Sequence, residues 1–199
     1  FTMDGFYMDE VTILGDQYNI VTFPQGASNL NFGMPALSHI SKSIIIPNNG
    51  LMNFDIVEEE YIEYLNIPVA PSKGNILRTI DPATVNYYFD DVYLDNNYYP
   101  ENIVKLEDPY VLRDLRGQTV VFSPFQYNPE TKILRVYTKI KLNIYNSGVD
   151  NRNVLNNNRF SNIIDNEYNY IYGNHFINYN NDTRFDYLVD HASMLIISD

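Results

Sequence analysis

The side chains of this sequence that are capable of acid–base or nucleophilic chemistry do not form a recognisable catalytic set. There are three histidines, His39, His175 and His191, and of these His191 has an acidic neighbour in Asp190. Cysteine is absent, which excludes a cysteine nucleophile, a thiolate metal site and a disulfide within these residues. No serine lies in a G-x-S-x-G motif. The sequence therefore predicts that this chain is not itself an enzyme.

An acidic segment holds candidate ligands for a cation. Its carboxylates and amides are those of Asp90, Asp91, Asp95, Asn96 and Asn97. Oxygen ligands of this kind suit Ca²⁺. However, their spacing differs from that of an EF-hand loop, and the glycine that such a loop needs for its turn is missing. We therefore predict a solvated acidic loop and neither a metal nor a cofactor.

The overall charge excludes some classes of partner. The chain has 25 acidic and 13 basic residues and a net charge of −12, whereas nucleic-acid binding requires clustered cations. No apolar run reaches the length of a membrane span. The charge is uneven, because the first 60 residues hold eight acidic side chains and a single base, Lys42. This pattern indicates solubility or, as an alternative, an acidic face for a basic partner.

The first two thirds of the sequence have the pattern of an all-β domain. Residues 133–145 alternate between apolar and polar side chains, which predicts a half-buried antiparallel strand. We expect it to pair with residues 118–125 across a turn at 127–131. Further strands are predicted at residues 6–14, 18–23, 41–46 and 51–66, between turns rich in Gly, Asn and Pro. This succession favours an antiparallel β-sandwich.

Two other segments depart from the strand pattern. Residues 68–100 contain four prolines and no helix or strand period, and a loop of this length is typically functional or disordered. Near the C-terminal end, apolar residues recur at helical spacing from Phe160 to Ile171, which predicts one amphipathic helix that ends near Gly173. The apolar run 193–198 predicts a further terminal strand.

Several of these segments resemble the N-terminal propeptide family of the gingipains, which are cysteine peptidases of family C25. The most specific part is Arg116-Gly117 followed by Pro124-Phe125-Gln126-Tyr127-Asn128-Pro129. Other similar stretches are the strand around Phe6 and Glu10-Val11, Met34-Pro35-Ala36-Leu37, Ile44-Ile45-Ile46-Pro47, Tyr99-Pro100, Leu115-Arg116-Gly117-Gln118 and Leu134-Arg135-Val136-Tyr137. The resemblance covers roughly residues 6–184. For Arg116 and Gly117 themselves we expect structural roles, with the glycine in a turn.

The resemblance implies a β-sandwich prodomain that inhibits its own cysteine peptidase and helps it to fold. The expected partner is the catalytic domain of that peptidase, and the expected location is secreted or on the bacterial cell surface. We accordingly expect a prodomain at residues 1–150, a linker, helix and processing segment at 151–184, and the start of a truncated catalytic domain at 185–199.

The resemblance also suggests how inhibition works. Gingipain-like precursors are expected to place a basic prodomain residue in the specificity pocket of the peptidase, and Arg78 is our candidate. A pocket built for Arg or Lys contains a buried carboxylate, to which a guanidinium offers a charge-assisted bond. The expected inhibitory loop comprises Arg78, Thr79, Ile80, Asp81 and Pro82. Lys73 and Arg113 remain alternatives for the same position.

Release of the prodomain requires a cut between it and the peptidase. Arg184 precedes Phe185 in a polar stretch, and polar connecting segments are preferred sites of proteolysis. We therefore predict processing between Arg184 and Phe185. Together with Arg78, this site implies a parent peptidase that prefers Arg.

A different class of function remains open at this point. The alternative is a free-standing β-sandwich on a cell surface that serves as an adhesin or a carbohydrate-binding module. Aromatic rings stack on sugars, and the chain offers a group of tyrosines for that purpose: Tyr87, Tyr88, Tyr93, Tyr98 and Tyr99.

Overall fold

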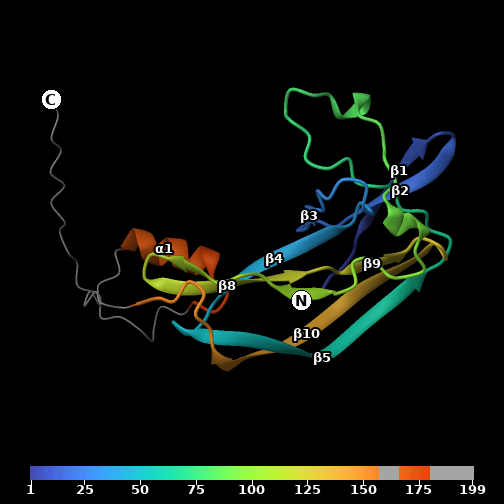
Figure 1. Cartoon of the computed structure of the whole chain (residues 1–199). Helices are drawn as coiled ribbons and strands as arrows, with labels where there is room; N and C mark the ends of the chain where they lie inside the picture. The colour runs from blue at the N-terminus through green and yellow to red at the C-terminus, as the bar shows by residue number, and fades with distance from the viewer. Residues whose placement is uncertain (157–165, 180–199) are drawn as a thin grey trace, which may run out of the picture. The chain divides into compact units, whose positions relative to one another are not determined.

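A computed structural model describes residues 1–156 and 166–179 of the chain (Figure 1). These residues form two compact units, and each unit draws on three separate parts of the sequence. Unit 1 comprises Phe1–Ser41, Asn53–Leu106 and Val120–Tyr145, and unit 2 comprises Lys42–Met52, Glu107–Thr119 and the described residues from Asn146 onward. Several strands therefore contribute residues to both units.

The strands form three sheets with antiparallel ladders. The sheets have the orders β1-β2, β5-β10-β9 and β3-β4-β8-β6, and β7 also pairs with β8. The strands are β1 (Tyr7–Ile13), β2 (Asp16–Thr22), β3 (Ala27–Ser28), β4 (Ser38–Ile45), β5 (Gly50–Tyr64), β6 (Val104–Leu106), β7 (Tyr110–Leu112), β8 (Leu115–Phe122), β9 (Phe125–Asn128) and β10 (Ile133–Val149). Two 3₁₀ turns, η1 (Pro82–Thr84) and η2 (Asp91–Leu94), and one helix, α1 (Asn166–His175), complete the described residues. The predicted antiparallel β fold with one helix near its C-terminal end is confirmed.

The opening hairpin forms where the sequence predicts it. Strands β1 and β2 pair from Tyr7 with Thr22 to Ile13 with Asp16. The turn consists of Leu14 and Gly15, whose φ angles are 54° and 98°. Two positive φ values match the right-handed twist of the flanking strands, which explains why a glycine lies at this position.

The predicted partner of the long alternating strand is wrong. Strand β10 pairs with β9, with Ile133 opposite Asn128, whereas β8 lies in another sheet. Proline has no backbone N–H, and Pro124 separates β8 from β9. The turn accordingly begins after Asn128, later than predicted. Leu134, Val136 and Ile140 are buried and Lys141 is exposed, as the alternation predicts, but Tyr137 on the other face is buried as well.

The core of unit 1 combines aliphatic and aromatic side chains. Val21, Val69 and Leu134 are fully buried. Phe125, also fully buried, contacts the rings of Phe6 and Phe23 with centroid distances of 5.7 and 5.8 Å. Val69 belongs to the segment from which the long loop 68–100 departs, so the start of this loop is part of the core.

In unit 2, the helix packs through one narrow stripe of side chains. Tyr172 and Phe176 are buried against Leu115. The helix continues through Gly173 and ends at His175, close to the predicted end near Gly173. Glycine within a helix costs about 1 kcal/mol relative to alanine, and burial of the two rings on either side of it offsets that cost. The first part of the predicted helix lies outside the described residues.

A fully buried arginine organises unit 2. The guanidinium of Arg116 donates hydrogen bonds to four backbone carbonyl oxygens at 2.8–3.0 Å, those of Pro47, Gly50, Arg152 and Asn153. It also lies 3.3 Å from a carboxylate oxygen of Asp150. A buried charge is tolerated only when it is paired and fully hydrogen-bonded. Arg116 therefore joins three chain segments that are distant in sequence, which agrees with the structural role expected of it.

The neighbouring glycine has a different role from the predicted one. Gly117 lies within β8 and not in a turn. A Cβ atom at this position would come within 2.5 Å of the Phe176 ring and 2.8 Å of the Tyr110 ring. The absence of a side chain thus allows the helix to pack closely on β8.

Replacement of Arg116 by methionine is expected to destabilise the protein strongly. The Arg116→Met variant leaves four buried carbonyl oxygens without donors, and loss of one partner of a buried ion pair costs roughly 3 to 5 kcal/mol. Urea unfolding followed by circular dichroism measures the change in the free energy of unfolding. Arg113→Met is the matched control, because its partly exposed ion pair with Asp114 contributes at most about 1 kcal/mol. Equal effects of the two variants would contradict the role assigned to Arg116.

The carboxylate beside Arg116 predicts a specific loss of stability in acid. The Arg152 side chain and backbone N–H donate to Asp150 and, with Arg116 nearby, lower the pKa of that carboxyl to about 2. Its contribution to stability is therefore complete above the unfolded pKa, near 4, and is lost as the pH falls toward 2. The difference in the free energy of unfolding between the wild type and Asp150→Asn should shrink over this interval. A difference that is constant from pH 5 to pH 2 would contradict the ion pair.

Candidate functional site

The long loop 68–100 leaves the core of unit 1 through a segment with hydrogen bonds on both sides. The Ala70 N–H donates to the carbonyl of Asn19 at 2.8 Å, and the Ala70 carbonyl accepts from the N–H of Ala36 at 2.8 Å. Two residues later, the Ser72 N–H donates to the carbonyl of Met34 at 2.7 Å. We call this segment, residues 68–72, the loop root. It is fixed as firmly as a strand inside a sheet.

The loop returns to the core through aromatic residues. Phe89 contacts the rings of Tyr18 and Tyr93 with centroid distances of 5.3 and 4.8 Å. The Tyr93 hydroxyl donates to the carbonyl of Val69 in the loop root at 3.0 Å. Burial raises the pKa of this hydroxyl well above its ordinary value, so the donor keeps its proton. Both ends of the loop are thus attached to the same part of unit 1.

Arg78 lies in a tight turn between these two anchors. The Ile80 N–H donates to the carbonyl of Leu77 at 2.9 Å, which closes the turn around Arg78 and Thr79. The Arg78 side chain is exposed and has neither a hydrogen bond nor an ion pair within the described part of the chain. Leu77 and Ile80 on either side are apolar and also exposed. In Figure 1 this green part of the loop extends away from the strands of unit 1.

The residues after the turn are stabilised by hydrogen bonds to Asp81. Asp81 accepts a hydrogen bond from the Ala83 N–H through its carboxylate at 2.9 Å. Its carbonyl accepts from the Thr84 hydroxyl at 2.7 Å. Asp81 therefore acts as the N-cap of η1, in which Pro82 is the first residue. Of the predicted inhibitory loop, Arg78 and Thr79 form the turn, while Asp81 and Pro82 stabilise the backbone that follows.

The two alternative cations are occupied by other contacts. The Lys73 Nζ donates to the carbonyl of Pro82 at 2.7 Å and lies 4.2 Å from the centroid of the Tyr87 ring. Arg113 forms an ion pair with Asp114 at 3.2 Å and lies 3.8 Å from the centroid of the Tyr168 ring. Of the three candidates, only Arg78 has a side chain without such contacts among the described residues.

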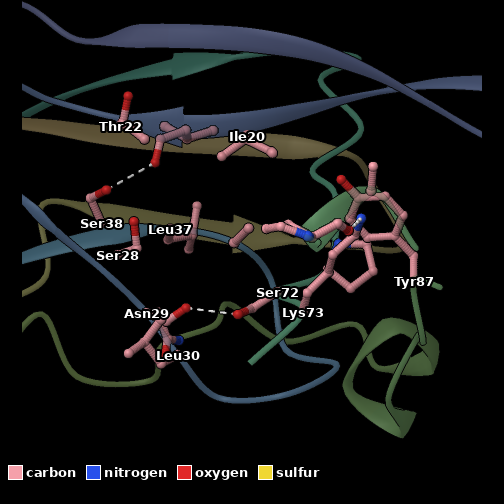
Figure 2. A pocket seen from close by; sticks show the side chains of 15 residues that line it. Ile20, Thr22, Ser28, Asn29, Leu30, Leu37, Ser38, Ser72, Lys73 and Tyr87 are labelled. Atoms are coloured by element: carbon pink, nitrogen blue, oxygen red, sulfur yellow. Dashed lines mark hydrogen bonds between the residues drawn. The ribbon is translucent and has the colours of Figure 1, made fainter. Parts of the chain in front are cut away.

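A cavity lies beside the loop root. It has a volume of about 310 Å³ and is lined by β2, by residues 28–38 and by the loop (Figure 2). Thr22 and Ser38 lie at one end of the cavity, and Lys73 and Tyr87 lie side by side at the other. The wall is mainly apolar, with Leu37 and Pro71 among its residues. Sequence patterns do not reveal this cavity, because segments far apart in the chain form its walls.

The other predicted residues do not form a second site. The group 90–97 includes η2, and in the described parts of the chain no three acidic or histidine side chains gather closely enough to hold a metal ion. The exposed His175 shares a hydrogen bond of 2.7 Å with the Tyr110 hydroxyl, and His191 lies outside the described residues. Arg184 and Phe185 also lie outside them.

The tyrosines considered for sugar binding are engaged in contacts of their own. Tyr87 lies under Lys73, and Tyr88 stacks on Phe32 with a centroid distance of 5.3 Å. Tyr98 contacts the guanidinium of Arg135 at 4.1 Å. Tyr93 and Tyr99 are held by hydrogen bonds. These contacts do not present the five rings as one exposed platform, so the geometry does not favour a carbohydrate-binding module.

The fold is an antiparallel β domain, and its long loop carries the exposed side chain of Arg78. The family model Propeptide_C25 matches residues 1–175, and the chain belongs to this family of propeptides. As a propeptide domain of gingipain-type precursors, it is not itself the catalytic part.

Individual relatives agree with this assignment. Gingipain R1 of Porphyromonas gingivalis is 37% identical over 156 residues, which are 78% of this chain and 16% of that protein. Gingipain R2 of the same species is 33% identical over 182 residues, which are 90% of this chain and 24% of that protein. The chain thus spans a quarter or less of the length of these relatives.

Two solved structures share the fold. The complex of the pro- and mature domains of Porphyromonas gingivalis RgpB contains a chain similar to this one, with a TM-score of 0.82, 32% identity and 90% of each chain covered. A structure concerned with the zymogenic latency of gingipain K from the same species has a TM-score of 0.63 and 17% identity, covering 75% of this chain and 85% of that one. The second likeness supports the fold alone.

Proposed function

We propose that this chain keeps a gingipain-type cysteine peptidase inactive by placing Arg78 in the specificity pocket of its catalytic domain. The observation that carries the proposal is the exposed guanidinium of Arg78, unpaired among residues 1–156 and 166–179, in a turn whose loop is attached to the core at both ends. The complex of RgpB pro- and mature domains shows that a similar prodomain does associate with a peptidase domain. Inhibition by this chain is therefore an association and not a chemical step.

The physical chemistry of the turn suits a peptidase cleft. A guanidinium forms paired, charge-assisted hydrogen bonds with a carboxylate, which are stronger than those between neutral groups. Leu77 and Ile80 supply apolar surface on either side of Arg78, and they are 70% and 43% exposed in the free domain. Burying such side chains against a partner stabilises the complex further. Because the turn is already formed, little conformational entropy is lost when it binds.

The proposal includes folding assistance, release and location. The prodomain would help its catalytic domain to fold by offering a preformed surface to the active-site cleft. A cut between Arg184 and Phe185 would separate the two domains and end latency. The precursor would be secreted or held on the bacterial cell surface. A parent peptidase that cuts after Arg accounts for both Arg78 and Arg184.

In the described residues no helix is long and apolar enough to span a membrane.

Loss of the Arg78 side chain is expected to weaken inhibition. Arg78→Ala should raise the inhibition constant against the mature domain of RgpB by at least about thirtyfold, because a desolvated charge pair contributes roughly 2 kcal/mol or more to binding. Hydrolysis of a fluorogenic peptide with Arg before the scissile bond measures this constant. Arg78→Lys should have an intermediate effect, and a peptide with Lys in place of Arg tests the preference.

The control for this experiment is Lys42→Ala, which removes another exposed cation from unit 2. It should leave the inhibition constant unchanged. If the unmodified chain does not inhibit, the proposed function is wrong. If it inhibits and Arg78→Ala inhibits equally well, a different residue enters the pocket.

Removal of Arg184 is expected to block processing. In a precursor in which this chain is followed by its catalytic domain, Arg184→Ala should accumulate as the uncut form, because a peptidase specific for Arg loses the side chain that it recognises. N-terminal sequencing of the mature peptidase should begin at Phe185 in the wild type. A mature N-terminus elsewhere would refute the site, and Lys132→Ala, at an exposed turn position, is the control.

A further inference from the structure

One side chain connects the two arms of the inhibitory loop. We call residues 73–78 the upstream arm and residues 79–87 the downstream arm. Lys73, in the upstream arm, donates from Nζ to the carbonyl of Pro82 at 2.7 Å and lies over the Tyr87 ring at 4.2 Å. Both partners belong to the downstream arm, and Figure 2 shows Lys73 beside Tyr87 at the end of the cavity. A hydrogen bond from an ammonium group and a cation–π contact thus link the arms.

The downstream arm has few other attachments to the core. No residue of η1 is buried. Pro82, Ala83 and Tyr87 line the 310 Å³ cavity, so space separates this arm from part of the apolar core. The hydrogen bonds of Asp81 remain within the arm and do not attach it to anything else. The link from Lys73 therefore holds the η1 part of this arm, whereas the stacking of Tyr88 on Phe32 holds the residues that follow it.

The upstream arm is better fixed than the downstream arm. Gly74 has a φ of +73°, and a Cβ there would approach the Phe32 Cβ to 3.1 Å, so this position requires glycine. Its N–H donates to the Ser72 hydroxyl at 3.1 Å, and that hydroxyl donates to the carbonyl of Asn29 at 2.8 Å. Lys73 lies between Ser72 and Gly74 and thus extends from a fixed backbone. It is well placed to hold a less constrained segment.

The turn that presents Arg78 lies inside the span that this link closes. The bond between Arg78 and Thr79 is about midway between Lys73 and Pro82 in sequence. A peptidase that binds Arg78 in its specificity pocket has this bond in front of its catalytic residues. An inhibitor with such a turn must therefore either slow the hydrolysis of the Arg78–Thr79 bond or remain bound after this bond is hydrolysed.

We propose that Lys73 is a positioning residue that makes the loop an inhibitor instead of a substrate. The inference rests on the proposed function. Hydrolysis of the Arg78–Thr79 bond consumes one water: the Arg78 carbonyl carbon gains the hydroxyl, the C–N bond breaks, and the Thr79 nitrogen gains the proton. The link keeps the new Arg78 carboxylate and the new Thr79 amine close together. Because they are close, the reverse reaction is favoured and neither arm leaves the cleft quickly.

The test compares Lys73→Met with the wild type in the presence of the mature domain of RgpB. Methionine is an unbranched side chain of similar length without the charge. Mass spectrometry follows cleavage at Arg78–Thr79, and the residual activity of the peptidase follows inhibition over hours. We expect cleavage to be at least about tenfold faster in Lys73→Met, because a charge-assisted hydrogen bond is lost. Inhibition should then decay with the same time course as cleavage.

Two further variants separate positioning from a general structural effect. Lys73→Arg retains a cation that can donate to the Pro82 carbonyl and should restore slow cleavage and lasting inhibition. Lys42→Met, an exposed lysine of unit 2, should behave like the wild type. If Lys73→Met proves poorly folded by circular dichroism, Tyr87→Leu removes the cation–π contact alone and should also accelerate cleavage.

The possible results distinguish this inference from the function on which it rests. If the wild type inhibits through Arg78 and Lys73→Met is cleaved at the wild-type rate, Lys73 does not position the loop. The inference also fails if Lys73→Met is cleaved rapidly but inhibits for as long as the wild type. If the wild type does not inhibit at all, the proposed function itself fails.

Discussion

The loop root is the element on which the functional part of this molecule depends. Residues 68–72 lie between β2 and the segment 33–36 and exchange backbone hydrogen bonds with both. Val69 and Ala70 are fully buried, so this backbone must be paired because water cannot reach it. The loop therefore starts from a fixed position, although most of its residues are exposed. An exposed side chain gains a defined position only when its backbone is attached in this way.

Because the loop is attached in this way, the core and the loop have different roles. The core of unit 1 supplies rigidity through packed aliphatic and aromatic side chains, whereas the loop keeps its own charged and apolar groups exposed. An inhibitor needs both properties, because binding surface that is buried in the free domain has no affinity to offer, and a mobile loop loses entropy when it binds. Arg78 and Lys73 illustrate the contrast: in the described part of the chain Arg78 has no partner, whereas Lys73 binds within the domain.

Unit 2 achieves its stability by a different means. Arg116, in β8, donates hydrogen bonds to four backbone carbonyl oxygens and forms an ion pair with the carboxylate of Asp150. Gly117 beside it leaves room for the rings of Tyr110 and Phe176. The motif Arg-Gly that marks the resemblance to gingipain propeptides is therefore explained by packing within the domain. Its residues need not contact the peptidase in order to be required.

The sequence by itself determined the class of fold, the first hairpin, the alternation of β10, the family and the candidate loop, because these depend on local periodicity, turn residues and short motifs. It misassigned the partner of β10 and the position of Gly117, because strand pairing and close packing depend on residues distant in the chain. Only the tertiary structure distinguished Arg78 from Lys73 and Arg113 as candidates for binding a partner. All three are cations in polar surroundings, and their difference lies in which neighbours the fold brings within hydrogen-bonding distance.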